Sequence, residues 1–120
     1  MKRHDFEKLV LEALESLPPR FQERLDNVDV VVNDRASKEQ LLANGLEDPL
    51  DLLGLYEGVP ITERHGYNMV LPDKITIFQV PIEAICSHRD EMVREIRDTV
   101  VHEIAHHFGI SDERLDEMGV

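Results

Sequence analysis

At 120 residues, with 42% hydrophobic and 32% charged residues, the chain is expected to form one domain with a mostly aliphatic core. Its formal net charge of −12 would repel a phosphate backbone or an anionic membrane surface, so neither nucleic acid nor a membrane is an expected partner. The single cysteine, Cys86, excludes an internal disulfide, and without a signal peptide or membrane-spanning run a cytoplasmic protein is predicted.

The first predicted element is an amphipathic helix over residues 5–17. Its apolar side chains recur at helical spacing and form one face: Phe6, Leu9, Val10, Ala13, Leu14 and Leu17. Asp5 is placed to cap this helix, and Pro18-Pro19 is expected to end it. A short helical turn is predicted next, over residues 21–25.

Three strands are predicted in the middle of the chain, at residues 28–32, 52–56 and 75–80. The first reads VDVVV, a β-branched run bounded by turn residues. Residues 35–49 are polar and interrupted by turn signals, and residues 58–72 are irregular. Pro81 is expected to stop the third strand and to open a short helix through Ile85.

The last long helix is predicted over residues 89–108. Its apolar residues share one broad face: Met92, Val93, Ile96, Val100, Ile104 and Phe108. Gly109 is expected to end it, and Ser111 to cap a last short helix. These elements predict an α+β fold, in which a small mixed sheet of three or four strands packs on helices and the long C-terminal helix forms the backbone of the domain.

This last helix carries the sequence H-E-x-x-H at His102, Glu103 and His106. Residues four apart lie one turn above each other on a helix, so both imidazoles can reach one metal ion. Glu103 projects about 100° away, beside the position of a metal-bound water, where a general base belongs. The alternative is a helix whose exposed histidines interact with the negative end of the helix dipole.

Two later residues extend the motif to H-E-x-x-H-x-x-G-x-x-D. A catalytic zinc ion takes three protein ligands and leaves one position for water. The third ligand cannot lie on the same helical face, but Gly109 in a left-handed conformation can turn the chain back toward the metal. Asp112 is the next suitable donor after that turn, whereas His107 is not expected to bind metal.

Residues 97–116 resemble the zincin metallopeptidases and follow the metzincin pattern, with Asp in place of the usual third His. A longer resemblance, to a family of small bacterial proteins with a minimal zincin-like fold, is carried by LYEGVPITER, LPDKITIFQVPIEAIC and VVHEIAHHFGISDERL. It implies a single zincin-like domain over residues 1–120, with His102, His106 and Asp112 as zinc ligands. Glu103 would be the general base and acid.

The motif and the resemblance together predict a zinc-dependent metallopeptidase that acts on a peptide or protein. Zincins commonly pair an extended substrate with an edge strand beside the active-site helix, and residues 75–80 could be that strand or an interior one. Tyr67 or His65 could stabilise an oxyanion, although both could also belong to a solvated loop. Asp98, one turn before His102, could accept the ring N–H of this ligand or simply be exposed.

Two alternatives to a peptidase are open. One is a metal-dependent endoribonuclease, because a bacterial family that matures ribosomal RNA has three histidines at this spacing. Three features favour the peptidase: this chain has Glu103 where that family has glycine, it has Asp112 where that family has a third histidine, and its net charge is acidic. The other is a catalytically inactive zincin-like interaction module, since only eight residues follow Asp112, where metzincins have a C-terminal subdomain.

Overall fold

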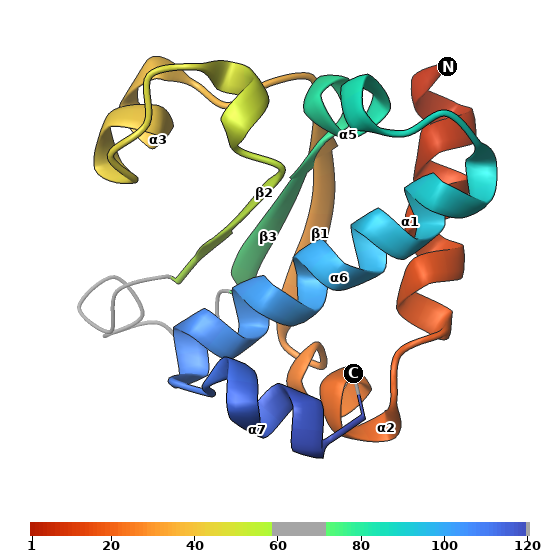
Figure 1. The fold of residues 1–120 in the computed structure, drawn as a ribbon, viewed down its shortest axis with the longest axis vertical. Helices are drawn as coiled ribbons and strands as arrows, with labels where there is room; N and C mark the ends of the chain where they lie inside the picture. Colours follow the sequence, from red (N-terminus) through yellow and green to blue (C-terminus); the bar gives the residue numbers. More distant parts are fainter. Residues whose placement is uncertain (59–71, 120) are drawn as a thin grey trace.

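The computed structural model describes residues 1–58 and 72–119 (Figure 1). Its elements are α1 (Arg3–Glu15), α2 (Pro19–Arg24), β1 (Val28–Asn33), α3 (Lys38–Ala43), η1 (Pro49–Asp51), β2 (Gly54–Glu57), β3 (Asp73–Phe78), α5 (Gln79–Ile85), α6 (Arg89–Phe108) and α7 (Asp112–Glu117). The α+β fold with a long C-terminal helix is thereby confirmed. None of the helices in the described part of the chain has the length and hydropathy needed to span a membrane.

The described strands form one mixed sheet in the order β1-β3-β2. β1 runs parallel to β3 and places Val30 opposite Ile75, while β2 runs antiparallel and places Tyr56 opposite the same residue. Residues 75–80 could have formed an edge strand or an interior strand. The structure shows the interior strand, because β3 lies between β1 and β2. The edge strand that lies beside α6 is β2 (Figure 1).

β3 ends two residues before the predicted end, because Gln79 already begins α5. Pro81 does not stop the strand but is the third residue of this helix. The N–H groups of the first helical turn have no acceptor within the helix, so a proline at this position costs no backbone hydrogen bond.

The main core lies between one face of the sheet and the two long helices, α1 and α6 (Figure 1). Its buried residues are Phe6, Leu9, Val10, Ala13, Leu17, Phe21, Ile75, Ile77, Ile82, Ile96, Val100, Val101, Ile104, Ala105 and Leu115. The predicted apolar faces of the two long helices are thus largely confirmed. Phe108 is the exception, because it is 44% exposed and packs under the guanidinium of Arg24, 4.5 Å from the ring centroid.

Residues 38–43 form a helix where the sequence analysis predicts only turns. Ser37 accepts a hydrogen bond from the backbone N–H of Gln40, whose side chain accepts one from the Ser37 N–H, which makes a capping box. The helix places Leu41 against Ala36 and Phe78 on the second face of the sheet. The N-terminus of α1 differs as well, since Lys2 is its N-cap and Asp5 caps no backbone group.

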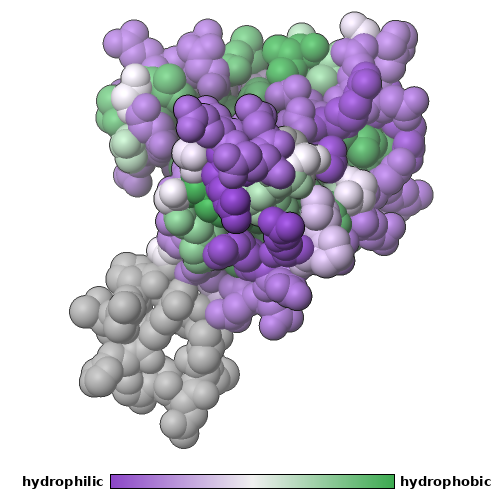
Figure 2. All heavy atoms as spheres, turned by 60° about the horizontal axis from the view of Figure 1, so that its bottom comes forward, coloured by the Kyte–Doolittle hydropathy of each residue, from purple (hydrophilic) through white to green (hydrophobic). Residues whose placement is uncertain are grey.

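The surface around α2 and α7 is mainly hydrophilic (Figure 2). Exposed acidic residues on α7 are Asp112, Glu113, Asp116 and Glu117. This end of the molecule therefore exposes part of the net negative charge to solvent.

Thr76 is a fully buried polar residue of the central strand, and its hydroxyl has no hydrogen-bond partner among the described residues. An unpaired buried hydroxyl costs about 1–3 kcal/mol, and valine would place a methyl group of similar size there. We expect Thr76→Val to raise the free energy of unfolding by about 1 kcal/mol in urea titration. Thr76→Ser keeps the hydroxyl and loses the methyl, so it should lower that free energy; a destabilised Thr76→Val would contradict this account.

Candidate active site

The site is built where α6 runs beside the edge strand β2. A Cβ atom at Gly54 would lie 2.5 Å from Cγ2 of Thr99 and 3.2 Å from the carbonyl oxygen of Thr76. Real Cβ atoms essentially never come as close to another atom as the first distance, so only glycine allows the helix to pack this near to the strand. Gly54 therefore permits the close approach of α6 to β2.

Tyr56 connects β2 to the C-terminal half of α6. Its ring stacks on the ring of His107, with centroids 3.9 Å apart and planes inclined by 20°. Its hydroxyl donates a hydrogen bond of 2.7 Å to Oδ2 of Asp73, and its backbone N–H donates one of 2.9 Å to Oε1 of Glu103. Helical spacing thus turns Glu103 and His107 toward the strand, and His107 packs against a tyrosine.

The same hydrogen bond shows which way the edge of β2 faces. In an antiparallel pair, successive residues turn their N–H and C=O groups to opposite sides of the strand. The carbonyl of Leu53 accepts a hydrogen bond from Phe78 of β3, whereas the N–H of Tyr56 bonds to Glu103. Tyr56 therefore marks the open edge of the sheet, and the carboxylate of Glu103 lies against that edge.

The Glu103 carboxylate lies in a partly buried position between α6 and β2, with 21% of its side chain exposed. Burial raises the pKa of Glu103 above its ordinary value, although the Tyr56 N–H and the nearby imidazoles of His106 and His102 act in the opposite direction. Oε2 of Glu103 is 4.0 Å from Nδ1 of His106. A carboxylate that binds a proton more readily than usual, beside two histidines, can both accept and return protons.

His102 and His106 lie one turn apart on the exposed face of α6, and their ring centroids are 6.4 Å apart. Nδ1 of His102 is 2.8 Å from the backbone carbonyl oxygen of Asp98. A carbonyl only accepts hydrogen bonds, so Nδ1 donates and Nε2 keeps a free lone pair for a metal ion. The predicted acceptor for the ring N–H of His102 is the Asp98 carboxylate. In the structure the main-chain carbonyl of Asp98 accepts this hydrogen bond instead.

The turn after α6 has the predicted conformation. Gly109 is left-handed, with φ 70° and ψ 28°, and the Ser111 side chain caps α7. Asp112, the first residue of α7, is exposed. Within residues 1–58 and 72–119, however, no three His, Cys, Asp or Glu side chains form a group that could hold a metal ion. The structure thus brings the two histidines and Glu103 together but does not join Asp112 to them.

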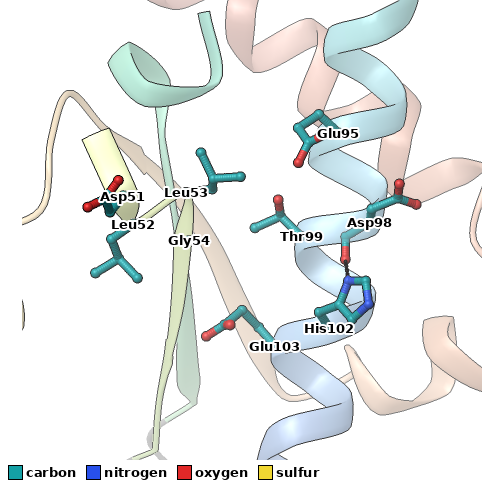
Figure 3. A pocket seen from close by; sticks show the side chains of 9 residues that line it. All are labelled: Asp51, Leu52, Leu53, Gly54, Glu95, Asp98, Thr99, His102 and Glu103. Carbon is teal, nitrogen blue, oxygen red and sulfur yellow. Dashed lines mark hydrogen bonds between the residues drawn. The ribbon is translucent and has the colours of Figure 1, made fainter. Parts of the chain in front are cut away.

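A groove of about 330 Å³ opens beside His102 and Glu103 (Figure 3). Its lining residues are Asp51, Leu52, Leu53, Gly54, Glu95, Asp98, Thr99, His102 and Glu103. The Glu103 side chain points from α6 toward β2, while the His102 ring lies over α6 itself, where it meets the Asp98 carbonyl (Figure 3). The two predicted oxyanion candidates, His65 and Tyr67, lie outside the described residues.

Tyr56 is not predicted as a site residue, although its N–H bonds to Glu103 and its ring stacks on His107. Its only sequence signal is its place in the predicted strand that leads away from Gly54. The partners are too far apart in the chain for any local pattern, since 47 positions separate Tyr56 from Glu103.

The sequence model of a family described as zincin-like metallopeptidase matches residues 25–120. The matched region contains all three described strands, α6 and α7, and with them His102, Glu103, His106 and Asp112. No curated protein matches the chain.

Proposed function

This chain belongs to the zincin-like metallopeptidase family, and we propose that it is a zinc-dependent hydrolase of a peptide bond or another amide bond. The observation that carries the proposal is the arrangement on α6, where His102 and His106 share one exposed face and Glu103 places a carboxylate beside them. The expected substrate is a peptide or protein. The family match supports this function over the endoribonuclease alternative.

We propose His102, His106 and Asp112 as the zinc ligands. Two imidazoles and a carboxylate suit zinc, and the hydrogen bond of His102 to the Asp98 carbonyl leaves Nε2 available for the metal. Because Asp112 does not yet join the histidines, we expect metal binding to draw it into the set. Gly109 provides the flexible position for this change, since glycine crosses backbone regions closed to other residues.

Bound zinc would lower the pKa of a water molecule and polarise the carbonyl group that is attacked. The carboxylate of Glu103 would take a proton from the attacking water and later return it to the leaving amine. The N–H of Tyr56 holds Oε1, which leaves Oε2 on the side of His106 for these transfers.

We place the extended peptide along the open edge of β2. In the register with β3, Gly54 lies opposite Ile77 and Tyr56 lies opposite Ile75. At both positions the main-chain N–H and C=O groups of β2 face away from β3. The Tyr56 N–H is held by Glu103, so a peptide on this edge would pair with the remaining outward main-chain groups of β2 and would run directly past the Glu103 carboxylate. This position for the substrate replaces the one that the sequence analysis considers at residues 75–80.

Metal analysis tests the proposal. We expect wild-type protein, purified without added metal, to contain about one zinc ion per chain, and a His102→Ala/His106→Ala variant to contain none. His106 is 69% exposed and His102 is exposed, so the variant should fold with an unchanged circular dichroism spectrum.

His107→Ala is the matched control on the same helix. It removes the ring that stacks on Tyr56 and should lower stability while zinc remains bound. A wild-type chain that contains no zinc and takes none up when zinc is added would contradict the proposed function.

A further inference from the structure

The groove beside Glu103 is lined by carboxylates and by no lysine or arginine. Asp51 lies on the wall formed by η1, and Glu95, Asp98 and Glu103 lie on α6. In Figure 3 the Glu95 side chain points from the helix toward the space in front of Leu53, whereas the Asp98 carboxylate lies on the outer side of the helix. The groove therefore has a strongly negative lining next to the proposed catalytic residue.

Three of these carboxylates, Asp51, Glu95 and Asp98, have no cationic partner in the described part of the chain. Ion pairs there involve other acidic groups, and none includes Asp51, Glu95 or Asp98. Like charges that share one groove repel each other, and a cation placed between them would relieve that repulsion.

Thr99 is a second, independent feature of the groove. It is only 8% exposed, its methyl group lies against Gly54, and its hydroxyl forms no hydrogen bond with the described residues. In Figure 3 its oxygen points along the groove toward Glu95. A hydroxyl that opens onto the groove can accept a hydrogen bond from the N–H of an ammonium or guanidinium group.

The opposite wall suits the stem of a long cationic side chain. Leu52 and Leu53 are half-buried and line the groove together with the methyl-bearing face of α6 at Thr99. Lysine and arginine bury their methylene groups along apolar surface while their charged ends reach polar partners. Leucines beside Glu95 and Asp51 offer both environments within about 330 Å³.

We propose that this groove is a subsite for a cationic group of the substrate, so that the chain prefers peptides with an ammonium or guanidinium group close to the cleaved bond. The inference rests on the proposed function and names the class of peptide that this site selects. Glu95 and Asp51 would bind the charge, and one N–H of the cationic group would donate a hydrogen bond to the Thr99 hydroxyl.

The test uses the zinc-loaded full chain and a set of quenched fluorescent peptides. Each peptide is acetylated and alanine-based, and a single position is scanned with lysine, arginine, norleucine or glutamate. At one position, lysine and arginine should give a kcat/KM about 10-fold or more above norleucine, which has the same stem without the charge. A parallel set with a free amino terminus and no basic residue shows whether the cation is instead the terminal amine.

Variants assign the preference to the groove. Asp51→Asn/Glu95→Gln should reduce the preference for lysine over norleucine to less than about 3-fold. The change should come from a lower kcat/KM for the lysine peptide, with the value for the norleucine peptide unchanged. Asp90→Asn/Glu91→Gln removes the same charge from α6 outside the groove and should keep the preference. Equal rates on basic, neutral and acidic peptides, or a preference that survives in the groove variant, would overturn the inference.

Binding separates this inference from the proposed function. Fluorescence anisotropy with zinc-loaded Glu103→Gln reports the affinity for the same peptides without any cleavage. A preference for lysine in binding, with no cleavage by the wild type, would retain the subsite and reject the hydrolase. Cleavage without a preference for a cation would retain the hydrolase and reject the subsite.

Discussion

Glu103→Gln should lower kcat/KM for peptide cleavage by about 10²–10⁴-fold, the usual contribution of a general base. The substitution removes the group that accepts the proton but keeps an amide oxygen in the position of Oε1. That oxygen can still accept the hydrogen bond from the Tyr56 N–H, so the contact between α6 and β2 should persist. The loss should therefore appear in the chemical step while the fold is retained.

Zinc content and melting temperature distinguish this outcome from simple unfolding. Both should match the wild type in Glu103→Gln, since neither histidine is changed. Glu91→Gln, on the same helix but outside the groove, is the matched control and should keep the wild-type rate. A fully active Glu103→Gln would assign proton transfer to another group. Equal inactivity of wild type and variant over a broad peptide set would favour the interaction-module alternative.

The region around the motif could be predicted from sequence because its signals are local. The periodicity of apolar residues predicts a helix over residues 89–108, and α6 has these bounds. Gly109 and Ser111 mark the turn and the next cap through their own backbone and side-chain preferences. The helical spacing of His102 and His106 likewise places them on one face without any tertiary information.

Other features depend on contacts between distant segments, which periodicity does not contain. Strand order is one: residues 75–80 would be mostly apolar whether they lay inside the sheet or at its edge. The main-chain partners of the site are another, since any residue type can offer the Tyr56 N–H or the Asp98 carbonyl. The helix α3 is different, because Ser37 and Gln40 form a local capping signal that could have been recognised.

The dependence of the site on close packing leads to a prediction at Gly54. Gly54→Ala should lower the free energy of unfolding by about 2 kcal/mol, because its new methyl group would overlap Cγ2 of Thr99 and press on the Thr76 carbonyl. Relief of that overlap moves α6 away from β2, which lengthens the hydrogen bond between Glu103 and Tyr56. Catalytic rate should then fall together with stability, as measured by urea titration and peptide cleavage.

A second substitution shows whether the overlap itself is the cause. Thr99→Ser removes Cγ2 and keeps the hydroxyl, so Gly54→Ala/Thr99→Ser should recover more than half of the lost stability, with the Thr76 carbonyl accounting for the rest. Gly58→Ala is the matched control on the same segment, because its Cβ would meet its nearest atom, Cε1 of His107, at 3.4 Å. It should cost less than about 0.5 kcal/mol. If Gly54→Ala costs no more than Gly58→Ala, the helix can shift without penalty, and the glycine does not set the distance between the proposed base and the edge strand.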